Sequence, residues 1–291
     1  METSDLIKKV RKIEIKTRRI SNQIFSGHYH SAFKGRGMAF SEVREYQYGD
    51  DIRSIDWNVT ARFNHPFIKI FDEERELTVM LIIDVSSSNI FGTVNSFKNE
   101  LITEIAAVLA FSAIQNNDKV GVIFFSDKVE KFITPKKGTH HILRIIRELI
   151  NFVPENKGTS ITEGLKYFTN VIKKRCTAFV LSDFIDNNFD NALRIANKKH
   201  DVIAVRISDP REKILPAIGL MKIKDAETGA DMWIDSSDAG VRRQYEQWWA
   251  KKEMSLRESF KKSGVDTVNI STGEDYVRPL TNLFRLRESR Y

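Results

Sequence analysis

The distribution of apolar residues changes at about residue 78. Beyond it, short apolar runs alternate with longer amphipathic segments, a pattern typical of a mostly parallel sheet covered by helices. The expected strands cover residues 78–85, 120–125, 129–133, 178–181, 202–207 and 265–270. The expected helices cover residues 95–115, 139–152, 160–174, 188–199, 238–263 and 276–286. We therefore predict an α/β fold, a doubly wound three-layer sandwich of Rossmann-like type.

The alternation breaks off between residues 210 and 237. Two short apolar runs, Leu220 to Lys224 and Met232 to Ile234, flank the turn-rich sequence 225–229. Asp and Gly in such a short connection favour a β-hairpin. We expect this hairpin to be an insertion in a main domain that spans residues 76–286.

The segment before the main domain has a different character. Apolar residues recur at helical spacing from Leu6 to Ile24 with basic residues between them, which predicts an amphipathic helix. An irregular polar and aromatic stretch follows, from Gly35 to Trp57. Its charged side chains are expected to pair in a semi-buried lattice that fixes the loop. They are Arg44, Arg53 and Arg62 with Asp50, Asp51 and Asp56. We expect residues 1–75 to pack on the main domain.

Composition narrows the class of protein. The 291 residues are 41% hydrophobic and 29% charged, which is enough apolar material for a substantial core. The apolar stretch 105–114 is shorter than the roughly 20 residues that a membrane-spanning helix requires. The first 16 residues mix both signs of charge where a signal peptide is apolar, so a cytoplasmic location is expected. The single cysteine, Cys176, is expected to be a small core residue.

The net charge of +7 is concentrated in two segments. Residues 1–33 and residues 241–263 each carry seven Lys or Arg against three Asp or Glu, so the remainder is near neutral. A basic helix can bind nucleic acid or an acidic protein, although a solvated helix face is the commoner explanation. Nucleic-acid binding through these helices, with Trp248 and Trp249 as stacking surfaces, is therefore an alternative function.

The most specific chemistry lies at the end of the first strand of the main domain. Asp84, Ser86 and Ser88 form an Asp-x-Ser-x-Ser motif on the loop that leaves this strand. Thr159 precedes a helix and Asp183 follows a later strand, so both belong at the carboxyl edge of the sheet, where ligands bind. Carboxylate and hydroxyl oxygens suit Mg²⁺ or Mn²⁺. These side chains predict a metal site, unless Asp84 and the serines only cap the following loop or helix.

These five residues resemble the metal-ion-dependent adhesion site of von Willebrand factor A domains. The resemblance implies a von Willebrand factor A-like fold in which Ser86, Ser88 and Thr159 contact the ion directly. It implies that Asp84 and Asp183 act largely through water molecules. It also implies an open coordination position, which a carboxylate from a protein partner fills.

The stretch from Gly35 to Arg62 carries a second resemblance. Its motifs are Gly35-x-Gly37-x-x-Phe40, Arg44-x-Tyr46, Gly49-Asp50-Asp51-x-Arg53-x-Ile55-Asp56-Trp57 and Ala61-Arg62. They are similar to the signature of domain-of-unknown-function family 58, and the resemblance extends over residues 30–235. Members of that family resemble adaptors or chaperone components that work with AAA+ ATPases of the MoxR type. The resemblance therefore implies a MoxR-type ATPase as the partner.

We expect a non-enzymatic, metal-dependent interaction module. The alternative is a metal-dependent phosphoesterase or nuclease that uses the same acidic edge. Phosphatases with an aspartate nucleophile need a second carboxylate two residues after the first, and that position is Ser86. Two-metal nucleases need several bridging carboxylates, whereas only Asp84 and Asp183 are evident in the sequence. The sequence also contains no P-loop motif for nucleotide hydrolysis.

Overall fold

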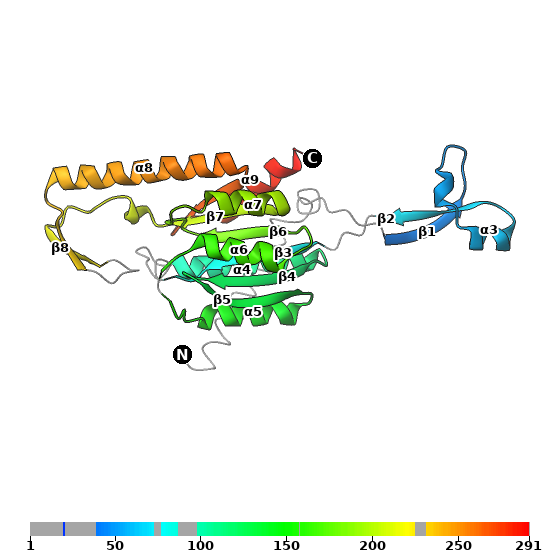
Figure 1. Ribbon diagram of the computed structural model, residues 1–291, viewed down its shortest axis with the longest axis horizontal. Coiled ribbons are helices and arrows are strands. Elements are labelled where there is room, and N and C mark those ends of the chain that lie inside the picture. Colours follow the sequence, from blue (N-terminus) through cyan, green and yellow to red (C-terminus); the bar gives the residue numbers. More distant parts are fainter. Residues whose placement is uncertain are drawn as a thin grey trace. The chain divides into compact units, whose positions relative to one another are not determined.

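The computed structural model describes residues 20, 39–72, 77–86, 98–156, 158–224 and 231–290 (Figure 1). The helix expected from Leu6 to Ile24, apart from Ile20, lies outside these ranges, and so does Ser88. The chain divides into two compact units, one over Phe33–Leu77 and one that contains Thr78–Tyr291. The packing of residues 1–75 on the main domain stays a prediction.

The larger unit is built on a six-stranded sheet with the order β10-β7-β6-β3-β4-β5. Its strands are β3 (Thr78–Asp84), β4 (Lys119–Phe125), β5 (Val129–Lys136), β6 (Thr177–Ser182), β7 (Asp201–Ser208) and β10 (Asp266–Ser271). All neighbours are parallel except β4 and β5, which form an antiparallel pair. The central strands β3 and β6 are buried almost throughout, which explains why their sequences show no polar alternation.

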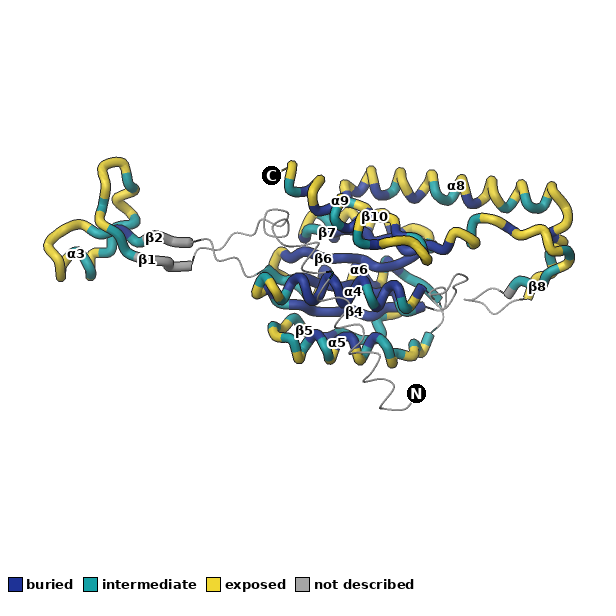
Figure 2. Tube along the Cα trace, turned by 180° about the vertical axis from the view of Figure 1, so that it is seen from behind, coloured by how far each residue is buried: buried dark blue, intermediate teal, exposed yellow. Residues whose placement is uncertain are grey.

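Helices flank this sheet (Figure 1, Figure 2). They are α4 (Lys98–Gln115), α5 (Thr139–Asn151), α6 (Ile161–Val171), α7 (Asp190–Lys199), α8 (Ala239–Ser263) and α9 (Val277–Glu288). One buried cluster joins α6, α7 and α8 to the sheet face that carries Met80, Ile82 and Val180. The predicted three-layer α/β sandwich is confirmed.

The predicted hairpin insertion is also present. After the short helix η3 (Pro210–Glu212), strands β8 (Leu220–Lys224) and β9 (Asp231–Asp235) pair antiparallel as a separate two-stranded sheet. The helix α8 follows, with Asp238 as its N-cap and Gly264, at φ 65°, as its C-cap. A left-handed residue at this position is a common helix ending, and glycine adopts it without strain.

The smaller unit contains more regular structure than its sequence indicates. Its elements are β1 (Ala39–Glu45), η1 (Ile52–Ser54), α3 (Trp57–Phe63) and β2 (Phe67–Asp72). β1 and β2 pair antiparallel with a bulge between Phe40 and Glu42. The prediction of an irregular segment was therefore wrong, because this pairing joins segments that are distant in sequence and leaves no local pattern.

The expected lattice of arginines and aspartates is present only in part. Arg44 donates two hydrogen bonds, of 2.9 and 2.8 Å, to the carboxylate of Asp50. Asp51 instead caps η1 and Asp56 caps α3, where each accepts hydrogen bonds from backbone N–H groups. Arg53 follows the cap Asp51, and Arg62 follows the cap Asp56. Within the described residues these two arginines form no ion pair, so the prediction of a lattice was wrong for both.

Gly121 provides a test of the packing between β4 and its neighbours. A Cβ at this position would lie 2.7 Å from Met80 Sδ and 2.8 Å from Pro135 Cγ. Gly121→Ala is therefore expected to destabilise the fold by about 1–3 kcal/mol, because a buried strand has no space for the methyl group. Urea unfolding measures this change. An unchanged free energy of unfolding would contradict the close packing at this position.

Candidate metal centre

Asp84 is held in place by two neighbouring segments. It ends β3, is only 1% exposed, and accepts a hydrogen bond of 3.0 Å from Ser86 N at Oδ1. Its Oδ2 accepts a hydrogen bond of 2.7 Å from Ser182 Oγ, at the end of the adjacent strand β6. The Ser86 hydroxyl also bonds to Asp84, and Ser86 is fully buried. The orientation of the carboxylate is therefore fixed before any ligand binds.

Asp183 follows β6 directly and lies beside Asp84. It is 1% exposed, and its Oδ1 accepts a hydrogen bond of 3.0 Å from Ile185 N. Burial first, and the neighbouring charge of Asp183 second, raise the pKa of Asp84 to about 6. Two carboxylates buried together repel each other, which favours a proton or another cation between them.

Thr159 reaches the same edge through a chain of backbone hydrogen bonds. Val85 N donates to Phe125 O (2.9 Å), and Ser160 N donates to Ser126 O (2.7 Å), so β3, β4 and the loop before α6 are tied together. The Ser160 hydroxyl accepts from Glu163 N and caps α6. Thr159 is thereby left free of capping, and its Oγ1 is buried without a hydrogen-bond partner in the described part of the chain.

Four of the five predicted site residues therefore lie at one edge of the sheet: Asp84, Ser86, Thr159 and Asp183. The fifth, Ser88, lies outside the described residues. No group of three or more His, Cys, Asp or Glu side chains suited to a metal occurs in the described ranges. A cation at this edge would therefore depend on hydroxyl oxygens, and the unpartnered Thr159 hydroxyl at the same edge as the buried carboxylates fits a hard divalent ion.

A buried lysine beside these carboxylates was not predicted from the sequence. Lys98 is the first residue of α4, and its side chain is 0% exposed. Its Nζ lies 3.1 Å from Asp183 Oδ2 and also pairs with Glu212, which belongs to η3 beyond β7. Burial acts to lower the pKa of Lys98, but the two carboxylates raise it above its usual value, so the side chain is an ammonium ion. The one available signal was a lysine at the start of a helix that is otherwise largely apolar.

Glu212 connects Lys98 to the segment that leads into the hairpin. Burial raises the pKa of Glu212, and the charge of Lys98 opposes this effect. Glu212 Oε2 accepts a hydrogen bond of 3.0 Å from Asp209 N in a capping box. Tyr245 of α8 donates its hydroxyl to Glu212 O (2.7 Å). Through Tyr245, the segment that holds Glu212 is therefore tied to α8.

The N-terminus of α6 is also fastened to this edge. Asp186, three residues beyond Asp183, accepts a hydrogen bond of 2.8 Å from Ile161 N, the first residue of the helix. Asp186 and Ser182 were not predicted as site residues. Both follow from the same rule that found Asp183, because polar residues just after a buried strand collect at its carboxyl edge.

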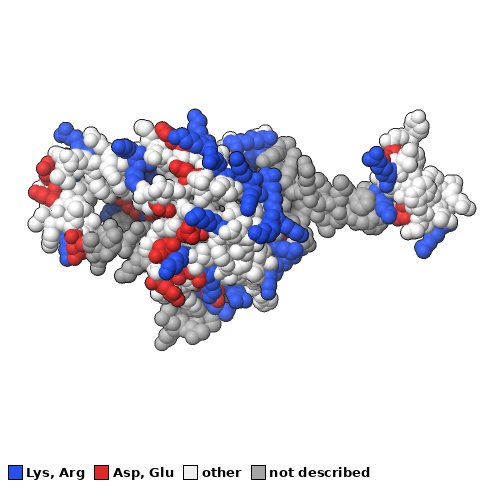
Figure 3. Space-filling view, in the orientation of Figure 1, with Lys and Arg blue, Asp and Glu red and all other residues white. Residues whose placement is uncertain are grey.

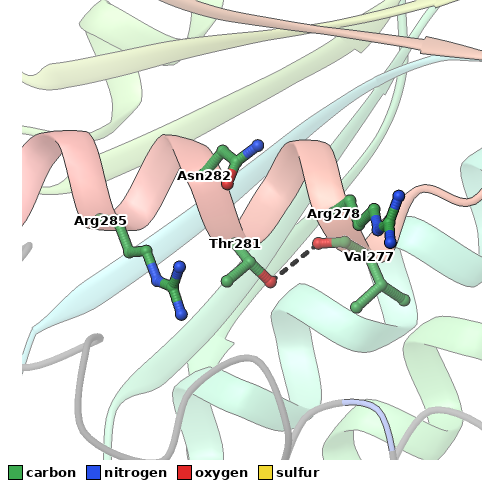
Figure 4. Close-up of a pocket in the computed structure, with 5 residues that line it drawn as sticks. All are labelled: Val277, Arg278, Thr281, Asn282 and Arg285. Atoms are coloured by element: carbon green, nitrogen blue, oxygen red, sulfur yellow. Dashed lines mark hydrogen bonds between the residues drawn. The ribbon is translucent and has the colours of Figure 1, made fainter.

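A surface hollow along α9 offers no comparable chemistry. It has a volume of about 460 Å³, and its described lining residues, all on α9, are Val277, Arg278, Thr281, Asn282 and Arg285 (Figure 4). The Thr281 hydroxyl donates to Val277 O (2.8 Å), so it is used within the helix. The described part of this lining contains no buried carboxylate and none of the predicted site residues.

One group of exposed basic side chains lies at the edge of the sheet opposite the candidate site. Basic side chains gather toward the right-hand end of the larger unit in Figure 3. Exposed basic residues precede β6 and β7 at the amino edge of the sheet: Lys173, Lys174, Arg175, Lys198 and Lys199. Of the two tryptophans considered for base stacking, Trp249 is 8% exposed and Trp248 47%, and Lys252 lies over the Trp248 ring. Only Trp248 is therefore available for stacking.

No helix in the described ranges is long and apolar enough to cross a membrane. An aerotolerance-related membrane protein from Bacteroides fragilis has a similar structure, with a TM-score of 0.51 and 15% identity over 74% of this chain and 100% of that chain. BatB from Bacteroides thetaiotaomicron has a TM-score of 0.49 and 15% identity over 73% of this chain and 99% of that chain. At such low identity the Bacteroides fragilis structure supports the fold alone.

The sequence comparisons show the family. An uncharacterized protein of Mycobacterium tuberculosis is 26% identical over 281 residues, which are 96% of this chain and 88% of that relative. The model of the family described as "Protein of unknown function DUF58" matches residues 42–255. Because this match covers more than half of the 291 residues, the chain belongs to the DUF58 family.

Proposed function

We propose that the protein is a metal-dependent interaction module that holds Mg²⁺ or Mn²⁺ and binds a carboxylate of a protein partner. The observation that carries this proposal is the buried Thr159 hydroxyl without a partner in the described structure, at the edge that buries Asp84. An unsatisfied buried hydroxyl costs about 1–3 kcal/mol. A bound cation would give this hydroxyl oxygen a partner and would also balance the buried negative charge.

The residues of the site have distinct parts in this proposal. Ser86 and Thr159 would offer hydroxyl oxygens, Ser88 is expected to offer a third, and Asp84 and Asp183 would act on the ion through water. When bound, the ion would supply a Lewis-acidic position for an incoming Asp or Glu. Ligands that are mostly neutral leave more of the ion's charge available to that carboxylate than a set of carboxylates would.

Family membership supports a MoxR-type AAA+ ATPase as the partner, with this protein as an adaptor or chaperone component. We further propose that it has no catalytic activity of its own. This is supported by Ser86, which stands where a phosphatase of the aspartate-nucleophile type needs a second carboxylate.

Thr159→Ala should change stability and metal binding in opposite directions. In EDTA the variant should be as stable as the wild type, or more stable by up to about 1 kcal/mol, because it loses an unsatisfied hydroxyl. In calorimetric titration it should bind Mg²⁺ about tenfold more weakly. Thr162→Ala is the control, because the Thr162 hydroxyl donates to Asn188 O instead. Equal Mg²⁺ affinity of the wild type and Thr159→Ala would contradict the proposed ligand set.

The stabilisation by Mg²⁺ should disappear in mild acid. The pKa of Asp84 is raised to about 6, so below that pH a proton occupies the carboxylate and competes with the ion. Thermal melts with and without Mg²⁺ should therefore differ above pH 6 and converge below it. Asp84→Asn should show little shift at any pH. A shift of equal size at about pH 7.5 and about pH 5 would count against Asp84 as a member of the site.

Association with the partner should depend on the same ion. Binding of a MoxR-type ATPase from the same organism should be weakened about tenfold or more by EDTA and by Asp84→Asn in Mg²⁺. EDTA also removes the Mg²⁺ that the ATPase itself uses, so the comparison of Asp84→Asn with the wild type in Mg²⁺ is the decisive one. If the wild type and Asp84→Asn bind the ATPase with equal affinity in Mg²⁺, the metal site takes no part in the interaction.

A further inference from the structure

Lys98 places a fixed positive charge inside the proposed metal site. Of the lysines in the described ranges it alone is buried, and its ammonium group is paired with Asp183 and Glu212. These partners follow two neighbouring strands, β6 and β7, so two separate segments hold the lysine. No single neighbouring loop can move it away without breaking one ion pair.

The charges of this cluster do not cancel. The cluster contains four carboxylates and two cations, a formal charge of −2 when all are ionised: Asp84, Asp183, Asp209 and Glu212 with Lys98 and Arg206. One divalent ion would balance that charge. Lys98, however, already occupies Asp183 Oδ2, and Ile185 N occupies Oδ1. Direct contact of an ion with Asp183 would compete with these two donors, so an ion at this edge would meet Asp84 and the hydroxyls and would reach Asp183 only through water.

We propose that Lys98 is a tethered counter-cation that keeps Asp183 from direct contact with the metal and thereby keeps the affinity of the isolated site low. This inference rests on the proposed function. Its consequence is that the ion is held firmly only when a partner supplies a further carboxylate. Metal binding and partner binding would then reinforce each other, because each completes the site for the other.

The test is Lys98→Met combined with Glu212→Gln. This double variant removes one positive and one negative charge, so the formal charge of the cluster stays at −2 while Asp183 is released. Calorimetric titration should show Mg²⁺ bound about tenfold more tightly than by the wild type. Asp183→Asn should weaken Mg²⁺ binding severalfold in the wild type, as Glu212→Gln does, because one compensating negative charge is lost. In the double variant, where Asp183 is released, the same substitution should weaken binding more, by about tenfold.

A matched control is available on the surface of the same unit. Lys131 and Glu148 form an ion pair of 2.6 Å between β5 and α5, and both side chains are about one-third exposed. Lys131→Met with Glu148→Gln makes the same change of charge away from the site. Its Mg²⁺ affinity should equal that of the wild type.

Circular dichroism shows whether the double variant folds. If it does not fold, a second variant tests the role of Lys98. Glu212→Gln alone keeps the ion pair between Lys98 and Asp183 and removes the one with Glu212, whose side chain is 13% exposed. It should weaken Mg²⁺ binding severalfold, because the ammonium charge near the ion is then less compensated. Unchanged or tighter binding by Glu212→Gln would overturn the role of Lys98.

The outcomes separate this inference from the proposed function. If the wild type binds Mg²⁺ and the folded double variant binds it equally or more weakly, the role of Lys98 is overturned and the metal site stands. If only the double variant binds Mg²⁺, Lys98 blocks the site and the proposed metal function of the wild type fails. Absence of binding by both proteins would overturn both proposals.

Discussion

Acidic and basic side chains are kept away from water together at the carboxyl edge of the sheet, and the arrangement of this edge depends on their mutual compensation. Burying a single ion costs several kcal/mol unless hydrogen bonds and an opposite charge replace its water. Asp84 therefore accepts hydrogen bonds from the Ser182 hydroxyl and from Ser86 N. Asp183 accepts them from the Lys98 ammonium group and from Ile185 N. Removing one partner would leave an uncompensated charge, so the donors are held in place before a ligand arrives.

The sheet order explains how distant segments reach this edge. β3 lies between β6 and β4, so Asp84 has Ser182 and Asp183 on one side and the end of β4 on the other. The loop with Thr159 is bonded to Ser126 just beyond β4. α4 and η3 add Lys98 and Glu212. The same parallel topology that buries the strands therefore assembles the polar side chains at their ends.

Strands, helices and the hairpin were predictable because each carries a local signal, such as the unbroken apolar run of β3. Asp84, Ser86, Thr159 and Asp183 were placed at one edge by the rule for strand ends, while their role toward a metal stays a prediction. The pairing of β1 with β2 and the ion pair between Lys98 and Asp183, 85 residues apart, were not predictable. Such contacts follow from tertiary packing and leave no pattern in the neighbouring sequence. The acids Asp51 and Asp56 were misjudged because helix caps compete with arginines for carboxylates.

The central claim is that hydroxyl oxygens and a buried carboxylate hold a divalent ion at the end of β3. The most direct measurement is anomalous scattering from a crystal of the full chain grown with Mn²⁺. The account predicts one peak within about 2.0–2.3 Å of Ser86 Oγ and Thr159 Oγ1, with Lys98 still paired to Asp183. A crystal with well-ordered Asp84, Ser86 and Thr159 side chains and no peak among them would contradict it.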